Sequence, residues 1–247
     1  MSQNIFDDPT FFEGYRQLRE GANFNDLLEQ PAMNALLPPL DGARVLDIGC
    51  GYGRNCLAFS EVAQHVDGVD ISVRMLNVAR KENCAGNISY HEMDMADIST
   101  LPGSYDLIYS SLAFHYCLDF PRLMKDCHDL LKEGGVLLFS QENPITTCAR
   151  NTDNRYVRDE EGNTFFKVAD YQDEGERHVR WFVDDVVHQH RKFSSIVHDI
   201  ASAGLILTDC VEPCPDKSAI KKLPGLAREL IKPSFIIFKC IRKETTK

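Results

Sequence analysis

Basic residues are scarce in this sequence, and long apolar runs are absent from it. Of its 247 residues, 27 are Lys or Arg and 37 are Asp or Glu, which gives a formal net charge of −10 at pH 7. We therefore expect no long nucleic acid as a partner, because binding its phosphates needs a basic face. No uncharged run approaches the length that crosses a bilayer, so we expect no membrane span.

Cysteines are frequent, but they lack the spacing of a metal or disulfide framework. There are nine, an odd number, without a C-x-x-C, and Cys210 and Cys214 stand apart from other ligand types. We expect no metal site, and reduced thiols as in a cytoplasmic protein. The N-terminus lacks a basic start and an apolar segment, so we expect no export signal. The sequence does not indicate an oligomeric state.

Three glycines at alternate positions follow a short apolar run that contains an acid. Residues 45–48 read Val-Leu-Asp-Ile, and Gly49, Gly51 and Gly53 come next. Glycine adopts positive φ easily and lets the backbone approach a ligand, so this pattern predicts a strand, a ligand-binding turn and a helix. Because such a turn also serves plain packing, the pattern needs a second signal.

The second signal is an acid at the end of the next predicted strand. Asp70 closes residues 66–70, the position that binds ribose hydroxyls in dinucleotide-binding folds. A helix-capping role is the alternative for this acid. The spacing predicts an adenosine-bearing cofactor, yet the third glycine comes one residue too early for the pyrophosphate-binding G-x-G-x-x-G form, which disfavours a nicotinamide cofactor.

The chain beyond this turn alternates strands with amphipathic helices. This pattern predicts one α/β domain with a parallel sheet that is covered on both faces. The expected strands are residues 44–48, 66–70, 88–91, 107–110, 136–140, 205–211 and 235–241. We expect Ser72 to cap a helix, and a Gly-Gly pair at 134–135 to end another.

Polar and aromatic side chains follow the third and fourth strands, at the edge of the sheet where ligands bind. Asp94 lies between Met93 and Met95, so its carboxylate can accept from an adenine amino group between two polarisable side chains. The alternative is that both Met pack in the core. His115 follows small residues in an aromatic run and can be a base or a packing residue.

Two further segments can border the site. Phe11, Tyr15 and Leu18 share one face of a predicted N-terminal helix, where Tyr15 and Arg19 can close over a cofactor or bind its carboxylate. Residues 141–192 exceed an ordinary loop and predict a lid that contains strands at 164–168 and 179–187. The lid offers polar groups for a substrate: Glu142, Tyr171, Arg180, His188, His190 and Arg191.

The motifs, taken in order, resemble those of the small bacterial class I S-adenosylmethionine-dependent methyltransferases. The resemblance rests on DIGCGYGRN, VDIS, MDMAD, SSLAFHY, LLKEGGVLLFSQENP and HQHRKFSSI, and it covers nearly the whole chain. It implies a Rossmann-like seven-stranded, mostly parallel sheet whose last strand is antiparallel and inserted between the fifth and sixth. It also implies that His190-Arg191 is the H-R pair of the family. Asn143-Pro144 departs from the family, which usually has His-Pro there.

With this resemblance, we expect four segments and a defined set of site residues. The segments are a helical cap (1–40), a cofactor-binding core (41–140), an inserted lid or substrate cap (141–192) and the C-terminal part of the core (193–247). The catalytic candidates are His115, His190 and Arg191. The candidates for binding S-adenosylmethionine, and its product S-adenosylhomocysteine, are Tyr15, Arg19, Asp47, Gly49, Gly51, Gly53, Asn55, Asp70, Ile71, Met75, Met93, Asp94, Met95, Ser110 and Leu112.

The resemblance implies methyl transfer to an O or N atom of a small molecule or peptide. A carboxylate is one such acceptor, because Arg191 can bind it bidentately while His190 orients it or takes a proton. Asp47 can organise the glycine turn or, through water, meet the ammonium of the cofactor. The alternatives are a non-catalytic S-adenosylmethionine-binding module and a nicotinamide-dependent oxidoreductase.

Overall fold

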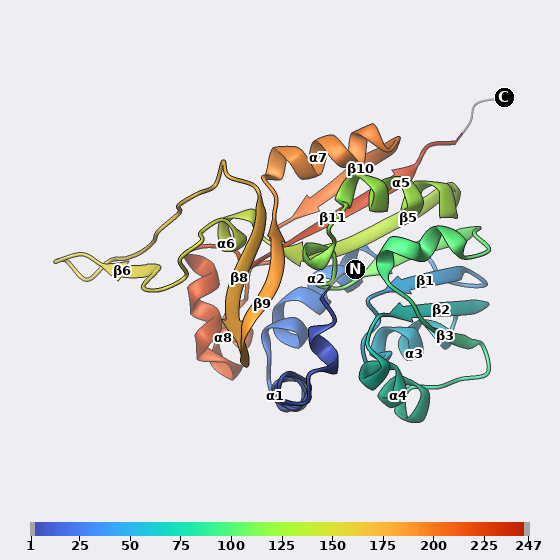
Figure 1. Cartoon of the computed structure of the whole chain (residues 1–247), viewed down its shortest axis with the longest axis horizontal. Helices are drawn as coiled ribbons and strands as arrows, with labels where there is room; N and C mark the ends of the chain where they lie inside the picture. Colours follow the sequence, from blue (N-terminus) through green and yellow to red (C-terminus); the bar gives the residue numbers. More distant parts are fainter. Residues whose placement is uncertain (1–2, 245–247) are drawn as a thin grey trace.

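The computed structural model describes residues 3–244, which form a central seven-stranded sheet (Figure 1). The strand order is β10-β11-β5-β4-β1-β2-β3, and β11 runs antiparallel to both of its neighbours. The expected Rossmann-like fold with an antiparallel last strand is therefore confirmed. The strands are β1 (Arg44–Ile48), β2 (His65–Asp70), β3 (Ile88–Glu92), β4 (Tyr105–Ser110), β5 (Leu131–Glu142), β10 (Leu205–Val211) and β11 (Phe235–Arg242).

Helices cover both faces of the sheet because the strands are apolar on both sides. Leu46, Ile108 and Phe139 belong to the buried cluster on one face, whereas Val45, Leu107 and Leu138 belong to the cluster on the other. The first cluster includes side chains of α5 (Phe120–Leu130), α7 (Phe193–Ser202) and η3 (Met95–Thr100). The second includes side chains of α2 (Gln30–Leu36), α3 (Arg54–Ser60) and α4 (Val73–Glu82).

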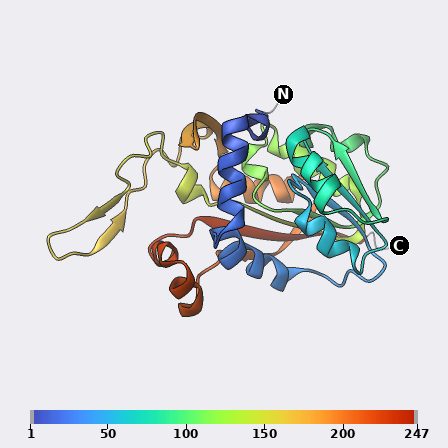
Figure 2. The same cartoon turned by 90° about the horizontal axis from the view of Figure 1, so that it is seen from below.

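Two hairpins lie outside the sheet, between β5 and α7 (Figures 1 and 2). They follow the short helix α6 (Pro144–Thr147) and consist of β6 (Tyr156–Arg158) with β7 (Thr164–Phe166), and β8 (Gly175–Trp181) with β9 (Val183–His190). The expectation of one strand over 179–187 is wrong, because the chain turns at Phe182, whose φ is +59°. The β6–β7 hairpin projects away from the body of the protein.

The N-terminal segment packs across the sheet edge and the β8–β9 hairpin. It contains η1 (Ile5–Asp7), α1 (Pro9–Glu20) and a π-helical turn, η2 (Asn25–Glu29). The Gln3 amide accepts from the N–H of Val187 and donates to the carbonyl of Asp185, which joins this segment to β9. Before β11 lie α8 (Lys217–Lys222) and η5 (Pro224–Leu230).

One smaller difference from expectation concerns the end of a helix. The helix expected to end at the Gly-Gly pair ends earlier, at Leu130, and Gly134 makes a left-handed turn at φ +75° inside β5. Ser72 caps α4 as expected, accepting from the N–H of Met75 at 3.1 Å. Within residues 3–244, no helix is long and apolar enough to cross a membrane.

The glycine turn after β1 needs glycine for two separate reasons. Gly49, Gly51 and Gly53 have φ values of +72°, +53° and +75°, which disfavour any residue with a Cβ. A Cβ on Gly49 would also lie 2.4 Å from the Cβ of Ala113, and a Cβ on Gly53 would lie 2.1 Å from the Tyr90 hydroxyl. Gly51 has nothing within 4 Å, so it borders open space.

We predict that Gly49→Ala lowers the free energy of unfolding by about 2 kcal/mol or more, because left-handed strain and overpacking add. The measurement is urea unfolding followed by circular dichroism. The matched control is Gly86→Ala, where φ is not positive and a Cβ meets nothing within 4 Å. An equal loss in both variants would contradict the role given to this turn.

Candidate functional site

One pocket of about 750 Å³ opens at the carboxyl ends of the central strands, beneath the N-terminal segment and beside the β8–β9 hairpin. Ligands bind at this edge in open α/β sheets. We name its two parts by the elements that form them. The glycine-loop half contains Tyr15, Gly49, Gly51, Asp70, Ile71, Met75, Met93, Asp94, Met95 and Leu112, and the hairpin half contains His115, Glu142, Arg155, Phe166, Trp181, His188 and Lys232.

Asp70 connects β2 to the glycine turn. Its two carboxylate oxygens accept from the N–H groups of Gly51 and Ser72, each at 2.8 Å. Burial raises the pKa of Asp70 to about 6, although both of these hydrogen bonds lower it. The carboxylate borders the pocket and retains further lone pairs, so it can accept from a diol.

The chemistry of the glycine-loop half fits an adenosine-bearing cofactor without a pyrophosphate. Met75, Met93 and Met95 supply polarisable walls for a flat ring, and Asp94 borders the pocket between two of them. The backbone at Gly51 faces open space, where a Cβ would otherwise intrude. These residues offer a carboxylate for the ribose, a slot for the ring and bare backbone for the rest of the cofactor.

Leu112 borders the same half in a strained conformation. Its φ is +52°, which a branched side chain rarely adopts, and such strain gathers at functional sites. Its N–H donates to the hydroxyl and to the carbonyl of Ser140, at 3.0 and 3.2 Å. These hydrogen bonds therefore hold the loop after β4 against β5.

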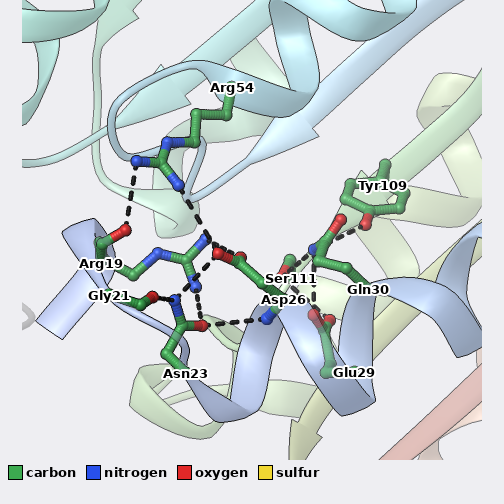
Figure 3. Close-up of polar contacts among 9 residues, drawn as sticks. All are labelled: Arg19, Gly21, Asn23, Asp26, Glu29, Gln30, Arg54, Tyr109 and Ser111. Carbon is green, nitrogen blue, oxygen red and sulfur yellow. Dashed lines mark hydrogen bonds and ion pairs between the residues drawn. The ribbon is translucent and has the colours of Figure 1, made fainter. Parts of the chain in front are cut away.

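Glu29 also binds the loop after β4, a role that we did not predict from the sequence. This fully buried carboxylate lies on the π-helical turn and accepts from the hydroxyl of Ser111 (Figure 3). It also accepts from the hydroxyl of Ser140. Burial raises its pKa above the ordinary value. An acid within an otherwise apolar helix face was the available signal. The π-helical turn adds weight to it, since such turns are frequent at functional sites.

Arg19 belongs to a neighbouring network and does not line the pocket, contrary to expectation. It pairs with Asp26 at 3.2 Å and donates to Asn23 at 3.3 Å, while Arg54 donates to its carbonyl (Figure 3). These contacts fasten the end of α1 to η2 and α3. Tyr15, one turn earlier, does border the pocket, and its ring lies 6.0 Å from that of Trp181.

A carboxylate and two imidazoles meet in the hairpin half. Glu142, at the end of β5, forms a 3.0 Å ion pair with Nδ1 of His188 on β9. Burial raises the pKa of Glu142, but the charge and hydrogen bond of His188, with the charges of His115 and Lys232, lower it to about 2. The N–H of Glu142 lies 3.4 Å from Nδ1 of His115. Burial lowers the pKa of His115 to about 4, so its ring is neutral at pH 7.

Two buried cationic side chains pack against one aromatic ring in the hairpin half. Arg155 and Lys232 are each 8% exposed, and both lie over the Phe166 ring, at 4.2 and 5.2 Å. The Arg155 guanidinium donates to the backbone carbonyls of 145, 146 and 167, so it mainly holds the segment together. Lys232 Nζ donates to the hydroxyls of Thr146 and Ser234, both at 2.8 Å, and borders the pocket.

His190 and Arg191, two of the catalytic candidates, do not line this pocket. Both ring nitrogens of His190 are engaged, by the Thr147 hydroxyl at 2.8 Å and the Tyr171 carbonyl at 3.0 Å. Arg191 donates to the carbonyl of Cys117 and lies 5.0 Å over the Phe120 ring. Both residues instead line a second, separate pocket beside the start of α7, so a role for this pair at the acceptor remains a prediction.

Four of the candidates for cofactor binding do not line the pocket, and neither does Asn143, which stands where the family usually has His. The four are Asp47, Gly53, Asn55 and Ser110. Asp47 is buried beneath the glycine turn, 3.3 Å from Cys56 Sγ, and Ser110 donates to the Ile48 carbonyl at 2.7 Å. Asn143 caps α6 by accepting from the N–H of Ile145.

Burial raises the pKa of Asp47 to about 7, with the charges of Asp70 and Glu29 adding to the rise. The folded state then holds this proton more tightly than the unfolded state. The stability that the protonated Asp47 carboxyl contributes is fully present below about pH 4 and is lost as the pH rises through 7. We predict that Asp47→Asn gains stability relative to the native protein over this range, by on the order of 4 kcal/mol at pH 8. Urea unfolding at several pH values measures this difference.

The matched control is Asp106→Asn at the start of β4. Burial raises the Asp106 pKa, but the hydrogen bonds from Arg44 and Lys132 outweigh it and lower the pKa overall. The neutral variant should therefore lose stability at neutral pH instead of gaining it. A stability difference for Asp47→Asn that stays flat with pH would contradict its burial as the cause.

Comparison with known proteins connects this site to one family. A methyltransferase domain family matches residues 46–139, which contain the glycine turn, Asp70 and Asp94. A crystal structure of an S-adenosylmethionine-dependent methyltransferase from Mesorhizobium loti is similar, with 35% identity, a TM-score of 0.81, and coverage of 87% of this chain and 97% of that one.

Two relatives extend the similarity. An uncharacterised protein of Haemophilus influenzae is 35% identical over 218 residues, covering 85% of this chain and 86% of the relative. A malonyl-[acyl-carrier protein] O-methyltransferase of Pectobacterium atrosepticum is 32% identical over 106 residues, which cover 43% of this chain and 41% of the relative. With the sheet order and the site above, this chain belongs to the class I S-adenosylmethionine-dependent methyltransferases, and its cofactor is S-adenosylmethionine.

Proposed function

We propose that the protein transfers the methyl group of S-adenosylmethionine to an oxygen atom of a small molecule bound in the hairpin half. The observation that carries this proposal is the continuity of one pocket from Asp70 to Glu142 and His188. A cofactor and an acceptor can share this space without solvent between them. The partial relative from Pectobacterium, an O-methyltransferase by name, supports oxygen over nitrogen.

The glycine-loop half is the proposed cofactor site. Asp70 would accept from the ribose hydroxyls, and Asp94 with the three Met side chains would surround the adenine. The loop of Leu112, held by Ser140 and Glu29, would border the methionine part. When bound, the cofactor supplies an electrophilic sulfonium methyl group, so the protein has mainly to align the acceptor and exclude water.

The segment 141–192 is the proposed substrate cap. Its β8–β9 hairpin brings Trp181 and His188 to the pocket, and its outer hairpin contributes Phe166. These side chains give the hairpin half a largely apolar, aromatic wall with a few polar groups, which is typical of a small-molecule site. Closing this wall removes water from the reacting atoms.

A carboxylate is the second candidate for the acceptor. Lys232 is buried, borders the pocket and can pair with an anion. The Pectobacterium relative is named for a malonyl group, whose free end is a carboxylate. A carboxylate is already a nucleophile, so this reaction would require no base from the protein.

We predict that Asp70→Ala weakens binding of S-adenosylhomocysteine by about 10- to 100-fold, because the ribose loses two hydrogen bonds to a charged acceptor. Isothermal titration calorimetry measures the affinity. The matched control is Glu92→Ala, an exposed carboxylate at the end of the neighbouring strand β3. Tight binding by Asp70→Ala would remove this residue from the cofactor site.

We predict that incubating the protein with cell extract and S-adenosylmethionine labelled in the methyl group yields a labelled small molecule. Mild alkali then separates the two candidates, because a methyl ester releases labelled methanol and a methyl ether does not. The control is the same extract with boiled protein. No labelled product at any protein concentration, despite binding of S-adenosylhomocysteine, would indicate a non-catalytic binding module.

A further inference from the structure

Glu142 and His188 form a carboxylate–imidazole pair that borders the proposed acceptor site. Nδ1 of His188 lies 3.0 Å from a carboxylate oxygen of Glu142, and the negative charge of that oxygen favours the ring proton on Nδ1, which leaves the lone pair of Nε2 for a ligand. No hydrogen bond engages Nε2 of His188 within residues 3–244. The ring is 8% exposed, and its residue lines the pocket, so Nε2 is available to a ligand there.

The arrangement is costly for the fold, which argues for a role in the site. A buried ion pair seldom stabilises a protein more than apolar side chains of the same volume. The charged or titratable groups that act on the pair are His115, Tyr116, His190 and Lys232, and burial lowers the pKa of Lys232. The pair thus lies among aromatic side chains, with the cationic groups of Lys232 and Arg155 in the same pocket.

Resting on the proposed function, we propose that His188 is the general base for a hydroxyl acceptor of the phenol or enol class and that Glu142 positions its ring. The acceptor O–H bond breaks, and its proton goes to Nε2 of His188. The oxygen lone pair forms the new O–CH₃ bond, and the electron pair of the broken S–CH₃ bond stays on the sulfur. The proton leaves His188 for solvent after the product departs.

The same geometry argues against the other acceptor classes. A carboxylate has no proton to give, and it would lie beside the ionised Glu142 in a site of low dielectric constant. An ammonium would meet the positive charges of Lys232 and Arg155. A hydroxyl is neutral when it binds, and Lys232 can stabilise the negative charge that develops on its oxygen.

The test compares catechol with 4-nitrocatechol, at a pH where only the second is largely ionised, in the native protein and in His188→Asn. The Asn side chain keeps a donor for Glu142 but has no base. We expect kcat with catechol to fall about 100-fold or more. We expect kcat with 4-nitrocatechol to change less than about 3-fold, because its proton is already gone. The native acid limb of kcat/KM for catechol should disappear in the variant.

The matched control is His178→Asn, which removes an exposed imidazole from the same hairpin. His178 pairs with Asp185 on β9 outside the pocket, so its loss should alter neither reaction. Glu142→Gln tests the positioning role, and we expect it to shift the acid limb for catechol with little change in KM. Titration with S-adenosylhomocysteine confirms that each variant keeps the cofactor site.

Equal losses of kcat with both catechols would overturn the assignment of a base and leave His188 a structural residue. If the native protein methylates neither, labelled cell extract serves as the acceptor. An alkali-stable ether that His188→Asn fails to form then supports the proposal, whereas esters or methylamines overturn it. The absence of any labelled product defeats the proposed function itself. If His188→Asn does not fold, Glu142→Gln decides the question, because it should lower kcat with catechol but leave kcat with ionised 4-nitrocatechol unchanged within about 3-fold.

Discussion

The carboxylate of Asp70 is the contact on which the geometry of the pocket depends. It accepts from the N–H of Gly51, in the turn after β1, and from the N–H of Ser72, which precedes α4. These two hydrogen bonds hold the glycine turn against the end of β2. The three positive φ values of the turn would be strained in any residue with a Cβ, and the backbone N–H of Gly51 is aimed at the acid only in that conformation. A ligand that reaches Asp70 therefore also contacts bare backbone.

The N-terminal segment transmits this geometry to the β8–β9 hairpin. Asp7 accepts a 2.6 Å hydrogen bond from the hydroxyl of Ser72, which directly follows Asp70 and Ile71 in the sequence. The side-chain amide of Gln3 donates to the carbonyl of Asp185 and accepts from the N–H of Val187, and both of these residues lie on β9. One short segment thus contacts the cofactor end of the sheet and the hairpin that carries His188. The N-terminal segment thus joins the two halves of the pocket, and its own residues Gln3 and Tyr15 line that pocket.

The sequence predicted local features well and long-range pairing poorly. The strand 205–211 and the glycine turn depend on residues next to one another, and both appear as expected. The left-handed turn at Phe182 has no glycine to announce it, so β8 and β9 read as one strand. The H-R pair was placed in the site by resemblance, but α6 brings Thr147 against His190. Glu29 was overlooked because its partners, Ser111 and Ser140, lie far along the chain.

Glu142 and His188 lie on different elements, so their contact depends on how these elements pack. Glu142 ends a strand of the core sheet, and His188 lies on the inserted hairpin, so the contact exists only while the hairpin packs on the sheet. Without the imidazole, a buried carboxylate would lack its partner and would take up a proton or require water. The docked hairpin therefore keeps Glu142 ionised, because the contact with His188 lowers the pKa of this carboxyl. The proposed substrate cap and the proposed base therefore belong to one segment of the chain.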